Sequence, residues 1–270
     1  MQVYNHYGMS QVAAAFTAAL GVEAPRQANV PAEPLMQLLR DSFPGGVADK
    51  VVIYNPDAIA QWIYQKYTPD FLTVTAATQL ALPLKTVMPS VTPVCFGTMY
   101  TGTDPEIHGI RKYEKPVIRT ASVYDALIRA GKRCAICSTV GASMSRIYLE
   151  RDMDYFVDYE TDEEATAKGI ELIKSGKYDF ISIYNGWYDH TMHGTCVESD
   201  EALQVMRDET RMFGEIVEAV KESYKKDNVF LGFCTDHGCH DNDNGHGTHG
   251  TDMYDDLNVL HFFGTIRNHD

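Results

Sequence analysis

The chain has little positive charge: its 270 residues carry 23 Lys and Arg against 37 Asp and Glu, which gives a formal net charge of −14. Proteins that bind a nucleic-acid polymer need a basic surface to neutralise the phosphate backbone. The composition therefore argues against DNA or RNA as a partner. A small anionic substrate stays open, because a bound cation reverses the sign of the local field.

The sequence also lacks a hydrophobic run of membrane-spanning length, so we expect no membrane segment. The first residues have no basic stretch, and the alanine-rich segment 13–21 contains Thr17, which favours a surface helix over a signal peptide. Six cysteines in a chain of this length do not resemble a disulfide framework, and the lone Cys134-x-x-Cys137 pair is better explained as core. We therefore expect a cytoplasmic protein with reduced thiols.

Strand-like and helix-like segments alternate along the chain. Buried strands are predicted over 50–57, 134–137, 178–184, 228–234 and 257–263, and helices over 58–67, 120–129, 161–176 and 201–224. Such alternation is typical of an α/β domain with a mostly parallel central sheet and helices on both faces. We predict one domain over residues 1–270, in which 1–50 form an N-terminal helical section. No segment has the length of a cap domain.

One polar stretch, 235–250, contains four histidines and three aspartates and follows the predicted strand 228–234. Asp236 and His237 should therefore lie where a buried strand leaves the sheet, the edge at which open α/β sheets bind ligands. Carboxylate oxygen and imidazole nitrogen are ligands of Zn²⁺ and Mn²⁺. The alternative is a glycine-rich surface loop whose histidines only titrate.

Further candidate ligands follow other predicted strands. Asp57 ends the strand 50–57, and Asp189 and His193, which follow 178–184, are spaced so that one helical turn puts both on one face. Thr92 precedes Pro93 at a predicted helix start, where backbone N–H groups favour an anion. Its hydroxyl could attack phosphorus there, or it could be an ordinary N-cap.

Taken in order, these segments resemble the alkaline phosphatase superfamily, nearest its nucleotide pyrophosphatase/phosphodiesterase and phosphonoacetate hydrolase branch. The resemblance spans about residues 50–265. It lies in Asp57, in the nucleophile segment Met88–Thr92 with Thr101-Gly102, Pro105 and His108-Gly109, in Asp189-x-x-x-His193, in Thr235-Asp-His-Gly238 and in His249.

The resemblance implies an alkaline phosphatase-like fold with a minimal cap and a site for two divalent metal ions, with zinc expected and manganese the alternative. One ion would be held by Asp57, Asp236, His237 and the Thr92 oxygen, and the other by Asp189, His193 and His249. His246 is the second choice for the last ligand. Two metals can stabilise the attacking and leaving oxygens of an in-line displacement.

The chain departs from the family pattern after the nucleophile. Family diesterases have an asparagine about twenty residues on, where this chain has Tyr113, and Lys112 or Lys115 could neutralise the same phosphate charge. The sulfatase pattern is absent, because Thr92 and Phe96 stand where it needs a cysteine or serine and an arginine.

Roles are also expected for three other histidines. His190 and His240 should support the ligands or lie on the surface, and His108 should make a structural turn contact.

The predicted function is hydrolysis of small phosphate esters (phosphodiesters, nucleotide pyrophosphates or phosphomonoesters) or of phosphonates, through a phosphothreonine at Thr92. One alternative is a phosphomutase of the phosphopentomutase kind, which normally carries a sizeable cap domain. Another is a member that binds a phosphorylated ligand without turnover. The sequence leaves the oligomeric state open, a homo-oligomer included.

Overall fold

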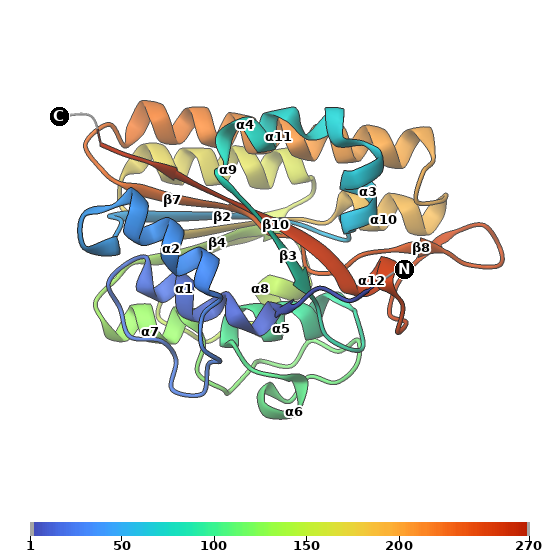
Figure 1. Ribbon diagram of the computed structural model, residues 1–270, viewed down its shortest axis with the longest axis horizontal. Coiled ribbons are helices and arrows are strands. Elements are labelled where there is room, and N and C mark those ends of the chain that lie inside the picture. The colour runs from blue at the N-terminus through green and yellow to red at the C-terminus, as the bar shows by residue number, and fades with distance from the viewer. Residues whose placement is uncertain (1–2, 269–270) are drawn as a thin grey trace.

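The computed structural model describes residues 3–268 and is organised around an eight-stranded sheet with the order β1-β3-β10-β7-β2-β6-β4-β5 (Figure 1). The strands are β1 (Tyr7–Gly8), β2 (Lys50–Pro56), β3 (Leu80–Lys85), β4 (Cys134–Thr139), β5 (Asp154–Tyr159), β6 (Phe180–Asn185), β7 (Val229–Phe233) and β10 (Asn258–Ile266). Strand β2 pairs in parallel with β6 and β7, whereas β10 runs antiparallel to both β3 and β7. The sheet is thus mixed and mostly parallel, which confirms the predicted architecture.

Helices cover both faces of the sheet, as Figure 1 shows. One face carries α3 (Gln61–Lys66), α4 (Leu72–Ala77), α9 (Asp162–Ser175), α10 (Trp187–Gly194) and α11 (Asp200–Ser223). The other carries α1 (Ala13–Ala18), α2 (Glu33–Ser42), α5 (Thr92–Thr101), α7 (Val123–Arg129) and α8 (Ser143–Ile147). Short elements lie in the connections: α6 (Pro105–His108), α12 (Tyr254–Leu257), 3₁₀ turns at Met9–Gln11, Pro44–Gly46 and Thr68–Phe71, and a hairpin of β8 (His240–Asp241) and β9 (Gly247–Thr248).

The sheet separates two apolar clusters, and strand β2 contributes to both. Val51 and Ile53 belong to one cluster, whereas Val52 and Tyr54 belong to the other. Successive side chains of a strand point to opposite faces, so a strand buried on both sides must be apolar without interruption. That requirement explains why the sequence 51–54 reads as a continuous apolar run.

Helix α1 lies in the core, so the predicted surface helix is wrong. Ala13, Ala15 and Phe16 are fully buried, and Phe16 packs against aromatic rings of the core. Thr17 suggested exposure, but its hydroxyl donates to the carbonyl of Ala14 and needs no solvent. A polar residue whose hydrogen bond is local can be buried at little cost.

Besides the two-residue β1, two strands near the edges of the sheet were not predicted. Strand β3 contains Pro83 and pairs along its length with β10, but on its other side only Leu84 and Lys85 pair with the two-residue β1. Most of β3 is therefore an edge strand, where a proline is tolerated. Strand β5, at the opposite edge, has no buried side chain and so gave no apolar signal.

No helix within residues 3–268 combines the length and apolarity needed to cross a membrane. All six cysteines have free thiols, as the sequence predicts. The cytoplasmic location stays a prediction. The longest connections between core elements, 19–32, 109–122 and 234–253, contain at most short turns and the β8–β9 hairpin, so no cap-sized insertion interrupts the described chain.

Candidate metal centre

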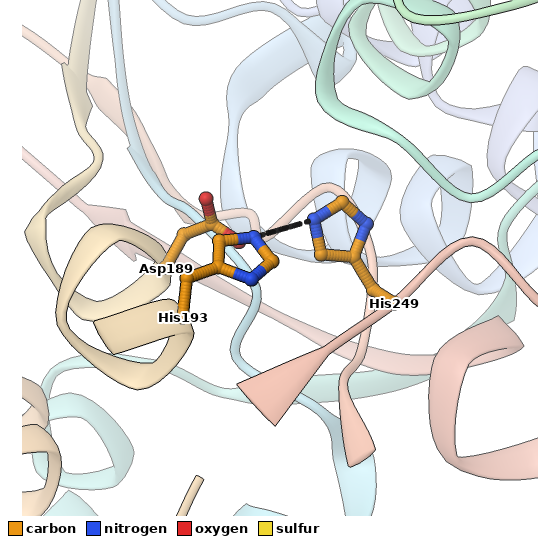
Figure 2. A group of neighbouring side chains, drawn as sticks. All are labelled: Asp189, His193 and His249. Carbon is orange, nitrogen blue, oxygen red and sulfur yellow. Dashed lines mark hydrogen bonds and ion pairs between the residues drawn. The ribbon is translucent and has the colours of Figure 1, made fainter. Parts of the chain in front are cut away.

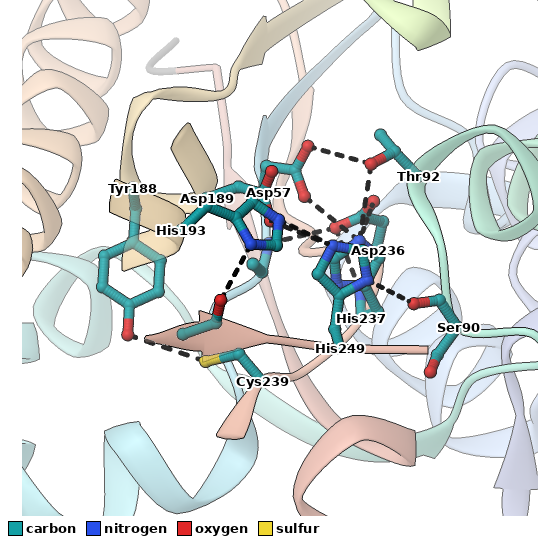
Figure 3. Close-up of polar contacts among 12 residues, drawn as sticks. Asp57, Ser90, Thr92, Tyr188, Asp189, His193, Asp236, His237, Cys239 and His249 are labelled. Atoms are coloured by element: carbon teal, nitrogen blue, oxygen red, sulfur yellow. Dashed lines mark hydrogen bonds and ion pairs between the residues drawn. The ribbon is translucent and has the colours of Figure 1, made fainter. Parts of the chain in front are cut away.

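The candidate ligands converge because three neighbouring strands, β7, β2 and β6, run parallel and end at the same edge of the sheet. Asp57 directly follows β2, Asp236 lies three residues beyond β7, and α10 begins two residues after β6. His249 comes from the segment after β9, and Thr92 is the first residue of α5 (Figure 3).

One group consists of Asp189, His193 and His249 (Figure 2). The Nε2 atoms of both histidines lie 3.3 Å from Asp189 Oδ1 and 3.2 Å from each other. Asp189 and His193 stand one turn apart on α10, as their spacing predicts. One ligand atom from each residue lies within 4.8 Å of the others, a spacing that can hold a metal ion.

A second group adjoins the first. His237 Nε2 lies 3.4 Å from Asp57 Oδ1 and 3.3 Å from Asp236 Oδ2, and Thr92 Oγ1 lies 3.4 Å from the same nitrogen. One ligand atom from each of Asp57, His237 and Asp189 also lies within metal-binding distance of the other two, so Asp189 is close to both groups. The rings of His237 and His249 stack with centroids 3.9 Å apart.

The three histidines of the cluster share one hydrogen-bonding pattern. Each Nδ1 bonds to a backbone carbonyl oxygen: His193 to Gly247 at 2.8 Å, His237 to Gly238 at 3.0 Å and His249 to Ser90 at 2.7 Å. A carbonyl only accepts, so each Nδ1 carries a proton and each ring directs its Nε2 into the cluster. Metal-binding histidines are oriented in this way.

The carboxylates complete a donor set that fits cations. Asp57 Oδ1, Asp189 Oδ1 and Asp236 Oδ2 are buried and receive no hydrogen bond from the described residues. Their ion pairs are with histidines alone, among the residues that the structure describes. Buried acceptors that face one another need a proton or a cation between them. The oxygen and nitrogen atoms therefore fit the two divalent ions that the resemblance implies.

The pKa values of the candidate ligands are shifted because these carboxylates are buried close together. Burial raises the pKa of Asp57 well above its usual range and that of Asp236 to about 7, with neighbouring carboxylates adding to both effects. Burial opposes ionisation of Asp189 as well, but the ion pairs with His193 and His249 outweigh it and lower its pKa. The bond to Asp189 in turn raises the pKa of His193 to about 9. Protons and metal ions thus compete for the same nitrogens.

The Thr92 hydroxyl contacts the candidate ligands and does not cap its helix. The residue that precedes the first turn of α5 is Val91, and no side chain caps that turn. The Thr92 hydroxyl donates instead to Asp57 Oδ2 at 3.3 Å, and the side chain is buried. The N-cap alternative is therefore wrong.

Tyr184 supports the centre and was missed in the sequence, where it is one apolar residue of a strand. Its hydroxyl donates a short hydrogen bond to Asp57 Oδ2, the oxygen that also accepts from Thr92. This arrangement leaves Asp57 Oδ1 free to face the cluster. Gly186 makes room for it, because a Cβ at that position would lie 2.7 Å from the Tyr184 hydroxyl.

The remaining histidines lie outside the cluster. His246 is exposed in the turn between β8 and β9, whereas His249 lies in the cluster, and its role as the last ligand stays a prediction. His190 is exposed on α10, and His240 Nδ1 pairs with Asp256 at 2.6 Å. His108 is buried, with Nε2 3.1 Å from Thr98 Oγ1 and Nδ1 accepting from the amide of Ile110, which is a structural turn contact.

The candidate substrate residues occupy an exposed part of the segment 109–122. Lys112 pairs with Glu114 at 3.4 Å, and Lys115 Nζ donates to the carbonyl of Gly141 at 2.9 Å and lies over the exposed ring of Tyr113. None of these contacts reaches the metal ligands, and a substrate role for Lys112, Tyr113 or Lys115 stays a prediction.

Neither a family model nor a curated protein matches the chain, whereas solved structures do. Murine ectonucleotide pyrophosphatase/phosphodiesterase 5 matches with a TM-score of 0.58 and 18% identity over 71% of this chain and 58% of its own. Phosphonoacetate hydrolase from Sinorhizobium meliloti matches with a TM-score of 0.54 and 14% identity over 70% and 56%. The periplasmic domain of a phosphoethanolamine transferase from Campylobacter jejuni matches with a TM-score of 0.53 and 15% identity over 84% and 82%.

The matched part of this chain thus spans less than three fifths of the length of the first two proteins. At such identities, the agreement concerns the course of the backbone. The chain has the alkaline phosphatase-like fold, shared with ectonucleotide pyrophosphatases/phosphodiesterases and phosphonoacetate hydrolase, the branch that its motifs resemble.

Proposed function

We propose that the protein is a hydrolase of small phosphate esters or phosphonates that depends on two divalent metal ions and uses Thr92 Oγ1 as its nucleophile. The observation that carries this proposal is the inward-facing donor set. Three imidazoles direct Nε2 towards three buried carboxylate oxygens that receive no hydrogen bond from the described residues, and the Thr92 hydroxyl lies beside them, 3.4 Å from His237 Nε2.

Two residue groups would hold the ions: Asp57, Asp236, His237 and the Thr92 oxygen in one, and Asp189, His193 and His249 in the other. The mixture of imidazole and carboxylate favours zinc, with manganese as the alternative. Bound there, the ions would supply positive charge that lowers the pKa of the threonine hydroxyl and stabilises the oxygens on phosphorus.

The chain's own residues orient the nucleophile. Asp57 Oδ2 lies 3.3 Å from Thr92 Oγ1 and fixes the direction of the hydroxyl. Loss of the hydroxyl proton lets Oγ1 form a bond to phosphorus, while the bond to the ester oxygen breaks and the leaving alcohol takes up a proton. Water then cleaves the phosphothreonine and restores the hydroxyl, which releases phosphate from a monoester or phosphonate and a phosphomonoester from a diester. In a phosphonate, the carbon–phosphorus bond breaks in place of the ester bond.

Related structures support the class of ligand. A threonine-to-alanine variant of the murine phosphodiesterase is described as inactive and was solved with AMP. The phosphonoacetate hydrolase was solved with phosphonoformate and with phosphonoacetate. Because this chain matches less than three fifths of those proteins, the choice among phosphomonoester, phosphodiester and phosphonate has to be measured.

The nucleophile can be tested by trapping. Metal-loaded protein is mixed with labelled substrates of the three classes and quenched rapidly in acid, and we expect the label on Thr92. Replacement of Thr92 by Val keeps the shape of the side chain and should lower turnover by several orders of magnitude, whereas Thr92→Ser keeps a hydroxyl and should retain part of it. Wild-type turnover in Thr92→Val would show that the threonine is not the nucleophile. Binding of substrate without turnover would instead favour the non-catalytic alternative.

The metal assignment can be tested with two histidines from the same segment. Elemental analysis of purified protein should give close to two divalent metal ions per chain. His249→Ala should lose at least one, whereas His246→Ala, changed three residues away in the exposed turn, should keep both. A protein that takes up neither zinc nor manganese would contradict the proposal.

A further inference from the structure

The first amides of α10, the helix that carries Asp189 and His193, are bound by an acidic side chain from another helix. Asp162, the first residue of α9, accepts from the amide of Gly186 at 3.2 Å and from that of Trp187 at 2.8 Å. Each oxygen of the carboxylate takes one donor. Asp162 therefore does for α10 what a capping side chain does for its own helix.

A second acid, from the middle of α11, binds the next amide. Glu209 Oε1 accepts from the amide of Tyr188 at 3.3 Å. The residue before α10 is Gly186, which has no side chain that could do this. Three successive amides at the start of α10 are thus held by two carboxylates that are distant from them in the sequence.

Both acids are buried at a cost to the folded state. Asp162 is 2% exposed and Glu209 is fully buried, and neither forms an ion pair with Lys or Arg within residues 3–268. Burial raises the pKa of Asp162 to about 7 and that of Glu209 well above its usual range. The amides and the helix dipole offset only part of such a penalty. An apolar residue at 209 would avoid that penalty but would leave the amide of Tyr188 unpaired.

The position of α10 decides whether one group of ligands can form. Asp189 directly follows the amide held by Glu209, and His193 lies one turn further on. Its ring is fixed at the other end of the helix by the bond from Nδ1 to the Gly247 carbonyl. His249, in contrast, comes from a separate segment, so the three ligands meet only while α10 keeps its place.

We propose that Asp162 and Glu209 are positioning residues: they hold the first turn of α10 so that Asp189 and His193 converge with His249, and they thereby set the affinity of that group for a divalent cation. The consequence for cation affinity rests on the proposed function. The effect on α10 itself does not, and it can be measured in metal-free protein.

Four variants separate positioning from general stability. Glu209→Ala removes the acceptor, whereas Glu209→Gln keeps an oxygen at Oε1. Asp162→Asn keeps one of two acceptors. Val220→Ala is the matched control, because Val220 is fully buried in α11 eleven residues beyond Glu209 and its truncation lowers stability without touching α10.

Hydrogen–deuterium exchange of the metal-free proteins and calorimetric titration with zinc are the two measurements. In Glu209→Ala, we expect exchange of the segment 187–195 to accelerate at least tenfold. The affinity for one of the two zinc ions should fall about ten- to a hundredfold, as it does when an outer partner of a ligand is removed. The second zinc ion should be bound as before. In both measurements, Glu209→Gln should resemble the wild type, and Asp162→Asn should give values between those of the wild type and of Glu209→Ala. Val220→Ala should change neither the exchange of the segment 187–195 nor the zinc affinity.

Unchanged exchange and unchanged zinc affinity in Glu209→Ala would overturn the inference and leave the proposed function standing. If that variant does not fold, Asp162→Asn decides, and wild-type zinc affinity there would overturn the inference equally. Failure of the wild-type protein to bind any divalent cation would overturn the proposed function together with the role in cation affinity.

Discussion

Replacing Asp236 with Asn should change the stability of the protein in opposite directions with and without metal. Asp236 Oδ1 accepts from the amides of Ala58 and His237, and an asparagine oxygen can keep both bonds. Oδ2 is buried without a donor, and burial raises the pKa of the carboxyl to about 7. The substitution therefore removes the part of the side chain that only a cation or a proton satisfies.

The size of the effect in metal-free protein follows from that pKa. Relative to about 3.9 in an unfolded chain, it lies about 3 units higher, and each unit corresponds to about 1.4 kcal/mol. A raised pKa means that the folded state binds the proton more tightly than the unfolded state. The contribution of this carboxyl to stability is therefore fully present below pH 4 and is lost as the pH rises towards 7. Asparagine avoids this loss of about 4 kcal/mol at pH 8, but its amide must still be desolvated. We expect a net gain of about 2 kcal/mol, or roughly 4–8 °C in Tm.

Zinc should make the wild type more stable than Asp236→Asn. A ligand that binds only the folded state adds about 4 kcal/mol when its free concentration is a thousand times the dissociation constant. The wild type gains this increment at the group that contains Asp236, whereas the variant loses an anionic ligand and most of the gain. Asp236→Asn should thus be more stable than the wild type in chelator and less stable in zinc.

Thermal unfolding at pH 8, in chelator and in buffered zinc, measures both signs. A repeat at pH 4 in chelator should show a much smaller difference, because the carboxyl is then protonated. Asp243→Asn, in the exposed turn between β8 and β9, is the control and should behave as the wild type. If Asp236→Asn loses stability in chelator and keeps the full zinc increment, Asp236 only accepts backbone amides, and Asp57, Asp189 and His237 hold the ion without it.

Three further predictions follow from single contacts. Tyr184→Phe removes the donor to Asp57 Oδ2 and should weaken zinc binding about tenfold in calorimetric titration without changing the circular dichroism spectrum. Gly238→Ala would place a Cβ 1.9 Å from the carbonyl of Asp255 and should cost about 3 kcal/mol in urea unfolding, whereas Gly194→Ala has open space and should be neutral. Burial lowers the pKa of His108 to about 4, so the unfolded state takes up this proton more readily as the pH falls. The free energy of unfolding of the wild type should therefore decrease by about 2 kcal/mol from pH 7 to pH 5, and that of His108→Gln should not show this decrease.

The sequence was most informative where function depends on residues close together in the chain. Asp189 and His193 are four residues apart, and helical geometry alone puts them on one face. Asp57 and Asp236 each follow an apolar run that could be recognised as a strand. Once the strands are parallel neighbours, their carboxyl ends must share an edge, and the meeting of the ligands follows from the fold.

Tertiary partners could not be predicted in the same way. Nothing in the run Phe180–Asn185 distinguishes Tyr184, whose hydroxyl reaches Asp57, from its apolar neighbours. Helix α1 was placed on the surface because Thr17 is polar, although its hydroxyl is satisfied one turn back. In both cases, the deciding fact is which atom a side chain reaches, and strand or helix periodicity does not contain it.

Glu209 is different, because a signal was present. The inward stripe of α11 contains Met206, Phe213 and Ile216, and Glu209 stands between the first two on the same face. A carboxylate in an apolar stripe is costly unless it has a partner, so the pattern itself indicates a polar contact inside the protein. It could not say that the partner is the first turn of α10.

The charge distribution also constrains the order of binding events. Asp57, Asp189 and Asp236 meet at the sheet edge, Asp162 and Glu209 lie behind α10, and the whole chain has a net charge of −14. A phosphate or phosphonate that approached this region without cations would meet carboxylates and no neutralising ion pair to Lys or Arg among the described residues. Such repulsion acts at close range in a poorly screened interior. For the proposed function, cation binding must therefore precede substrate binding.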